Sequence, residues 1–251
     1  MKYKDFSTSI WKSINDSLDL ALKQDPKPIA AFDADGTLWD MDMGEAFFQY
    51  EIDKKNVQLP NDPWDFYQNL KAIPAGPNQA YLWLAQIYTG IKLEKVRLWA
   101  EQAVKDLQLV PIFTEQKKLI ELFHSRGVQV YVVTASVKWA VEPGAKLLGI
   151  AADHVIGVET KVVDNKVTDI LNGRVTSHEG KALALIEKTK GKKPFFVSGN
   201  TEGDLALLES ASQTRLVVSA ASRDDHLFKT ESRLQKLAEQ KNWLSHRFIL
   251  D

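Results

Sequence analysis

The chain has 251 residues, with 32 basic and 33 acidic side chains and a formal net charge of −1 at pH 7. This balance gives no electrostatic case for a nucleic-acid or membrane-surface protein, so we expect neither as a partner. The absence of cysteine excludes disulfides, thiolate catalysis and cysteine-bound zinc. No apolar run approaches the ~18 residues of a membrane span. We expect a cytoplasmic protein, or a periplasmic one if a leader has been removed.

The first third of the chain predicts one helix, one strand and then a long helical stretch. An amphipathic helix is predicted from Met1 to Gln24, and a short apolar strand follows at Ile29–Phe32. Four more helices are then predicted without an intervening strand, at Glu45–Asp53, Pro63–Leu70, Pro77–Tyr88 and Leu93–Lys105. This stretch is too long to be a loop in a compact domain, so we expect a cap with its own packing.

After Pro111 helices and strands alternate, a pattern typical of a parallel sheet with right-handed crossovers. Strands are predicted at Val128–Val133, Val155–Val158, Pro194–Ser198 and Arg215–Ser219, the last taken as the final core strand, with a hairpin at Lys161–Thr168. Helices are predicted at Thr114–Arg126, Val137–Leu148, Gly180–Lys190, Asp204–Ser210 and Asp224–Trp243. The fold class is therefore α/β: a doubly wound, Rossmann-like parallel core (1–42 and 110–251) with an inserted helical cap (43–109).

Polar residues follow the apolar strands at several points. They are Asp33, Asp35, Thr134, Ser136, Asn200 and Asp204, and Lys181 opens a helix between two strands. In a doubly wound sheet these strand ends meet at one crevice. Oxygen ligands without His or Cys suit Mg²⁺ rather than zinc, and a lysine beside them binds a phosphate as a point charge.

Four motifs in order carry a resemblance to a known family. They are D-A-D-G-T at Asp33–Thr37, V-V-T-A-S ending at Ser136, E-G-K ending at Lys181, and S-G-N-T-E-G-D at Ser198–Asp204. Together they resemble the haloacid dehalogenase superfamily, in its phosphoserine-phosphatase-like and phosphocholine-phosphatase-like branch. The resemblance spans about residues 29–219.

The resemblance implies a role for each motif residue in a Mg²⁺-dependent phosphatase. Asp33 would be the nucleophile that forms an aspartyl phosphate, and Asp35 would be the general acid and base. The implied phosphate-binding residues are Gly36, Thr134, Ala135 and Lys181. The implied Mg²⁺-binding residues are Asp33, Asp35 through its carbonyl, Asn200 and Asp204, the last acting on a metal-bound water or on Lys181.

Asn200 departs from the family pattern, because phosphoserine phosphatases usually carry Asp at this position. An amide oxygen still binds Mg²⁺ but removes one negative charge. A competing interpretation is therefore a degenerate member that binds a phosphorylated metabolite without turning it over.

The choice of substrate is expected to come from the cap, because the core handles only phosphate. A phosphoserine-type site needs a cap arginine, and alignment by eye places Trp83 and Leu84 there instead. Acids near the first motif, Asp42 and Glu45, and aromatic faces suit a substrate cation. The residues expected to contact the small phosphate ester are Trp39, Asp42, Glu45 and Trp139. This favours phosphocholine or phosphoethanolamine, with phosphoserine phosphatase or phosphomutase activity as alternatives; the sequence does not specify an oligomeric state.

Overall fold

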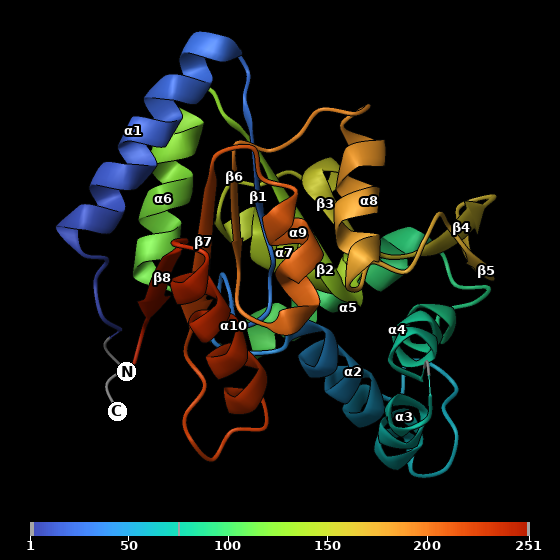
Figure 1. Ribbon diagram of the computed structural model, residues 1–251. Helices are drawn as coiled ribbons and strands as arrows, with labels where there is room; N and C mark the ends of the chain where they lie inside the picture. Colours follow the sequence, from blue (N-terminus) through green and yellow to red (C-terminus); the bar gives the residue numbers. More distant parts are fainter. Residues whose placement is uncertain (1–2, 75, 250–251) are drawn as a thin grey trace.

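The computed structural model describes residues 3–74 and 76–249, and its core is a six-stranded sheet (Figure 1). The sheet strands are β1 (Ile29–Phe32), β2 (Gln129–Val137), β3 (Val155–Val158), β6 (Phe196–Gly199), β7 (Thr214–Ser219) and β8 (Leu244–Arg247). The core helices are α1 (Thr8–Gln24), α6 (Thr114–Ser125), α7 (Lys138–Leu147), α8 (Glu179–Lys188), α9 (Leu205–Glu209) and α10 (Phe228–Gln240). The cap helices are α2 (Met43–Lys54), α3 (Pro63–Ala72), α4 (Gly76–Gln86) and α5 (Leu93–Asp106). A hairpin consists of β4 (Thr160–Val163) and β5 (Lys166–Leu171).

The sheet is parallel throughout, in the order β3-β2-β1-β6-β7-β8. Phe32, the last residue of β1, pairs with Val132 on one side and with Ser198 on the other. The residues that follow these three positions therefore emerge at the same edge of the sheet, where ligands bind in open α/β folds.

Alternate residues of the central strands pack on opposite faces of the sheet, as the two-residue period of a strand requires. Ala30 and Phe32 join the cluster that contains α1, α6 and α7. Ile29 and Ala31 join the cluster that contains α8, α9 and α10. Figure 1 shows α1 and α6 on one side of the sheet and α8, α9 and α10 on the other. Burial on both faces confirms the predicted doubly wound α/β core.

The four cap helices share a third cluster, formed largely by aromatic side chains such as Phe48, Tyr67 and Tyr88. This cluster includes Trp139 of α7, so the cap packs directly on the core. The hairpin is also bonded to the cap: the Gly90 N–H donates to the Val167 carbonyl at 2.8 Å. The division into core and cap stays a prediction, to which the structure adds this attachment of the hairpin.

Three elements differ from expectation. The strand β8 follows β7, so Arg215–Ser219 is not the final core strand; L-S-H-R is too polar to be recognised, and its edge position leaves it half-buried. The strand β2 runs on to Val137, which places Thr134 and Ser136 within the strand rather than after it. The first helix begins at Thr8, and residues 1 and 2 lie outside the described part of the chain. Across residues 3–74 and 76–249, no helix combines the length and the apolar character needed to cross a membrane.

Candidate active site

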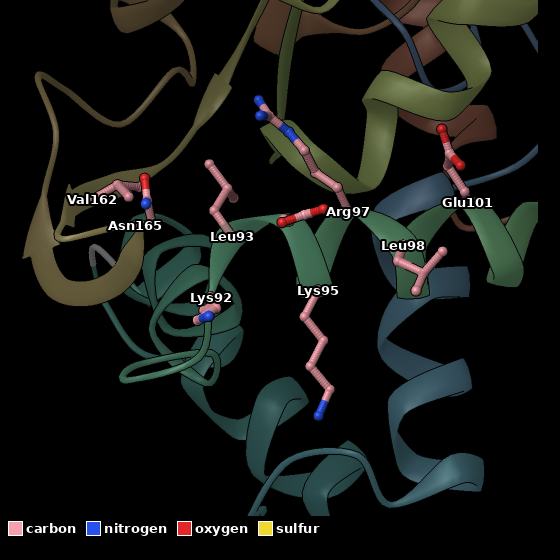
Figure 2. A pocket seen from close by; sticks show the side chains of 9 residues that line it. Lys92, Leu93, Lys95, Arg97, Leu98, Glu101, Val162 and Asn165 are labelled. Atoms are coloured by element: carbon pink, nitrogen blue, oxygen red, sulfur yellow. The ribbon is translucent and has the colours of Figure 1, made fainter.

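A cavity of about 410 Å³ opens at the carboxyl ends of β1, β2 and β6. The residues that line it come from all four motifs, from the segment 40–42, from the cap and from the segment 221–231. They are Asp33, Asp35, Gly36, Asp40, Met41, Asp42, Glu45, Lys71, Tyr81, Thr134, Ala135, Ser136, Lys181, Asn200, Thr201, Ala221, Asp225, His226, Leu227 and Glu231. A larger cavity, of about 730 Å³, lies between α5 and the hairpin. Figure 2 shows its mixed lining, including Lys95, Arg97 and Leu98, none of which belongs to a motif.

Asp33 lies at the base of the first cavity in a buried three-member charge cluster. The Lys181 Nζ is 2.6 Å from Asp33 Oδ1 and 2.5 Å from Asp204 Oδ1. Burial opposes the charge on Lys181, but the two carboxylates outweigh it and raise the pKa of this lysine. Burial and the Asp204 carboxylate raise the pKa of Asp33 to about 7, and Lys181 opposes them. The structure thus joins three residues that are far apart in the sequence.

Asp35 accepts three hydrogen bonds that fix its carboxylate. The Trp39 Nε1 and the Met43 N–H donate to Oδ1 at 2.8 and 2.9 Å. The Ser136 hydroxyl donates to Oδ2 at 2.7 Å. Burial raises the pKa of Asp35, and these three hydrogen bonds act in the opposite direction. A carboxyl group that is oriented by its neighbours and has a raised pKa is suited to proton transfer.

Asn200 lies at the end of β6 and is 2 % exposed. Its Oδ1 is 3.3 Å from the Thr37 hydroxyl, which also donates to Asp33 Oδ2 at 2.9 Å. The amide oxygen and the Asp33 carboxylate therefore face the same hydroxyl. Gly36 packs against this amide with φ +74, and a Cβ there would lie only 2.1 Å from Asn200 Nδ2. Only glycine both adopts this positive φ readily and leaves the space that a Cβ would fill.

The four expected phosphate-binding residues, Gly36, Thr134, Ala135 and Lys181, all line the cavity, but the expected use of the Gly36 N–H needs correction. Thr134 and Ala135 both line it, and the Thr134 Oγ1 accepts the Ser136 N–H at 3.0 Å. The Gly36 N–H instead donates to the Trp39 carbonyl at 2.9 Å, which closes the turn after β1. Gly36 therefore supplies turn geometry and space for Asn200, and its N–H is already engaged.

The oxygen atoms in this cavity fit a Mg²⁺ ion that keeps several of its waters. Within the described ranges, no three His, Cys, Asp or Glu side chains gather into a ready-made metal-ligand group. The candidate donors are the Asp33 carboxylate, the Asn200 amide oxygen and the Asp35 carbonyl. One carboxylate with neutral oxygens is a chemically suitable set, because Mg²⁺ is commonly held by one or two carboxylates and water. Asp204 is 0 % exposed and already paired with Lys181, so its position fits the orienting role expected for it.

The cap contributes Glu45 and Lys71, whose carboxylate and ammonium groups lie 3.0 Å apart at the cavity wall. Asp42 caps the start of α2 by accepting the Glu45 N–H at 2.7 Å, and it lines the cavity too. Tyr81 of α4 lines the same wall. Asp42 and Glu45 thus both line the cavity, and their contact with a substrate stays a prediction.

The expected positions of Trp39 and Trp139 need correction. Their side chains are 0 % and 1 % exposed, and neither lines the cavity. Trp39 packs in the core beneath Asp35, to which it donates a hydrogen bond, and Trp139 packs against Tyr88 with ring centroids 6.1 Å apart. Large aromatic side chains near a site are more readily absorbed by the core than presented to a ligand.

Several residues of the cavity wall were missed, among them Lys71, Tyr81 and Glu231. Glu231 had a detectable signal, since it lies on the same helical stripe as the buried Leu234 and Ala238. An acid on an apolar stripe requires a polar partner inside the protein. Lys71 and Tyr81 had no such signal, because their direction depends on how the cap helices pack.

Comparisons with known proteins identify a family model and one curated relative. Residues 30–209 match the model of the family described as haloacid dehalogenase-like hydrolase. The chain is 24% identical over 194 residues to the phosphorylcholine phosphatase of Pseudomonas aeruginosa, covering 61% of this chain and 54% of that protein, so it spans about half the length of this relative.

Two solved structures show the same fold. A functionally unknown protein from Anaerococcus prevotii superposes with a TM-score of 0.72 at 14% identity, covering 98% of this chain and 95% of the other. A phosphoserine phosphatase in its apo form superposes with a TM-score of 0.52 at 16% identity, covering 87% and 99%. The family model covers most of the sequence and includes all four motifs, whose residues meet in one cavity. The chain belongs to the haloacid dehalogenase-like hydrolase family.

Proposed function

We propose that the protein is a Mg²⁺-dependent phosphomonoesterase that acts on a small phosphorylated metabolite. The observation that carries this proposal is the convergence of Asp33, Asp35 and Lys181 on one cavity. A buried carboxylate beside a buried lysine is a suitable nucleophile for a phosphoryl group, because the lysine meets the phosphoryl charge. The oriented acid Asp35 supplies the proton that the leaving alcohol needs.

The proposed reaction has two steps. An oxygen of Asp33 attacks phosphorus, the bond to the leaving oxygen breaks, and Asp35 protonates that oxygen. Water then attacks phosphorus of the aspartyl phosphate, Asp35 takes its proton, and phosphate and free Asp33 are released. Lys181 and Thr134 hold the phosphoryl oxygens in both steps. A bound Mg²⁺ ion would neutralise charge on those oxygens.

The charge of the cavity lining favours a substrate whose leaving group is positively charged. Outside the four motifs, the lining acids Asp40, Asp42, Glu45 and Asp225 outnumber the one lysine, Lys71, among the described lining residues, and that lysine is already paired with Glu45. A choline or ethanolamine ester of phosphate has the complementary charge. The similarity to a phosphorylcholine phosphatase points to the same class of substrate.

A second candidate, phosphoserine, is favoured by Lys71 and Tyr81, a cation and a hydroxyl beside the leaving-group position. This role requires Lys71 to leave Glu45, at a cost of about 1 kcal/mol or less for a partly exposed ion pair.

The test is release of phosphate from p-nitrophenyl phosphate with and without Mg²⁺, using Asp33→Asn as the matched control. We expect Mg²⁺-dependent turnover by the wild type and at least about 1,000-fold less by Asp33→Asn. Wild-type turnover no higher than that of Asp33→Asn would leave only the non-enzymatic interpretation.

A panel of phosphate esters then identifies the leaving group. We expect phosphocholine or phosphoethanolamine to exceed phosphoserine in kcat/KM, and Asp42→Asn to reduce kcat/KM for the cationic esters more than for p-nitrophenyl phosphate. A kcat/KM for phosphoserine about tenfold above that for phosphocholine would establish the second candidate instead.

A further inference from the structure

Glu231 is a buried acid that the proposed reaction does not use. It lies on α10, is 2 % exposed and lines the cavity behind Asn200. Its Oε1 accepts the Asn200 Nδ2 at 3.0 Å, and its Oε2 accepts the N–H groups of Ala220 and Ala221 at 3.1 and 2.9 Å. Burial raises the pKa of Glu231, and all three of these donors oppose that shift, which is how an ionised acid is held inside a protein.

This contact determines which way the Asn200 amide points. The two ends of an amide side chain are nearly equal in shape, so its orientation follows from its partners. An ionised glutamate only accepts hydrogen bonds, and it therefore binds the NH₂ end of the amide. The Oδ1 atom is left facing Thr37 and Asp33.

The same contact also affects the charge of the candidate cation site. Asp33 is the one carboxylate side chain among its three candidate ligands, and Asp33 Oδ1 is already bonded to Lys181. Asn200 contributes no charge. Glu231 carries a negative charge at one hydrogen bond from the Asn200 amide, in a buried region where solvent screens little.

We propose that Glu231 is a positioning residue for a divalent cation. It acts through Asn200, holding the amide oxygen toward the cation and supplying the negative charge that the amide lacks. A single carboxylate ligand would supply both an oxygen atom and a negative charge. In the pair Asn200–Glu231, Asn200 supplies the oxygen and Glu231 supplies the charge. This inference rests on the proposed function, because it assumes that the cation site is used.

The test is the dissociation constant for Mn²⁺, a probe for an oxygen-ligand site, measured from the EPR signal of the free ion. We expect Glu231→Gln to weaken binding by about tenfold or more, the range typical for a residue that orients a metal ligand. Glu239→Gln, which removes the same charge from an exposed position on the same helix, should leave binding unchanged. Circular dichroism of each variant separates lost binding from lost folding.

A charge-swap variant keeps the test decisive if Glu231→Gln does not fold. In the double variant Asn200→Asp/Glu231→Gln, the carboxylate lies at the cation and the amide lies behind it, so the hydrogen bond and the net charge are both retained. We expect this variant to fold and to bind Mn²⁺ at least as tightly as the wild type. A swap variant that fails to fold or to bind contradicts the inference.

The outcomes separate this inference from the proposed function. Equal Mn²⁺ affinity in Glu231→Gln and wild type overturns the role of Glu231 and leaves the phosphatase proposal standing. Weaker binding in Glu231→Gln, in a protein whose wild type releases no phosphate from any ester, supports the role of Glu231 and overturns the phosphatase proposal. A wild type that binds no Mn²⁺ overturns both.

Discussion

The candidate acid Asp35 depends on its neighbours as much as on its own chemistry. A free carboxyl side chain rotates, and proton transfer requires it to stay near one orientation. Three hydrogen-bond donors hold the Asp35 carboxylate here. One of them is the indole of Trp39, a residue that the sequence predicted to contact the substrate. The same side chain thus fills the core and orients the acid.

We expect Trp39→Phe to lower kcat by about tenfold with little change in KM, because the lost hydrogen bond serves proton transfer rather than binding. The measurement is steady-state kinetics on p-nitrophenyl phosphate. Trp11→Phe is the matched control, since it removes an indole bond to a carboxylate, Glu115, outside the cavity lining. Equal kcat values in the two variants would show that Trp39 has only a packing role.

The cap carries a buried acid, Glu51, that is 0 % exposed, and neither of its carboxylate oxygens has a hydrogen-bond partner among the described residues. Burial raises the pKa of Glu51 from 4.5 to about 7, and the nearby side chain of Asn56 acts in the opposite direction. The folded protein therefore keeps this proton up to about pH 7, while the unfolded chain releases it near pH 4.5. The free energy of unfolding falls as pH rises between these values, by about 3 kcal/mol.

We expect Glu51→Gln to remove the fall in the free energy of unfolding between pH 4.5 and about pH 7. The variant should match the wild type in stability near pH 4.5 and exceed it by about 3 kcal/mol above pH 7. Urea unfolding at a series of pH values measures the difference. A difference that stays constant across the series would show that Glu51 remains ionised in the folded protein.

At the scale of elements, the motif residues were predictable and their supporting residues were not. Asp33, Lys181 and Asn200 follow or flank apolar strands in a repeating pattern, and parallel strands bring their ends to one edge. Lys71 reaches the cavity from a helix whose rotation is set by tertiary packing, and the apolar stripe of α10 indicates that Glu231 is buried but not that it contacts Asn200. The strand β8 was missed because an edge strand needs little apolar character.

The cap is joined to the core through helices α5 and α7. Arg97 of α5 donates from Nε and from its terminal amino group to the two carboxylate oxygens of Glu142 at 2.7 and 2.8 Å. The Glu142 side chain is 8% exposed, so removal of its partner leaves a buried carboxylate unpaired. A second pair, Lys146–Glu101, joins the same helices at the surface, where Lys146 is 74% exposed.

We expect Arg97→Ala to lower the free energy of unfolding by about 2 kcal/mol, because the buried acid loses both hydrogen bonds. Lys146→Ala should lower it by less than about 1 kcal/mol, since an exposed ion pair contributes little. Urea unfolding of the two variants provides the comparison. Equal losses would mean that the Arg97–Glu142 pair behaves as a surface contact.

At the scale of the whole molecule, the cavity has two walls with different tasks. The sheet edge holds Asp33, Asp35 and Lys181, the proposed nucleophile, acid and phosphate-binding lysine, and these suit any phosphate ester. The cap wall, the segment 40–42 and the segment 221–231 line the rest of the cavity and carry most of the remaining charge, and we propose that they contact the leaving group. This division explains how the reaction type follows from the four motifs, while the substrate depends on residues whose placement requires the folded structure.

The central claim is that Asp33 carries the phosphoryl group, and trapping the phosphoenzyme tests it most directly. The enzyme is mixed with phosphocholine and Mg²⁺, quenched during turnover and reduced with borohydride, which converts an aspartyl phosphate to homoserine. Mass spectrometry of the peptides then locates the change. The account predicts homoserine at position 33 and at no other aspartate, with none in Asp33→Asn. Turnover without homoserine, or homoserine at another aspartate, would contradict it.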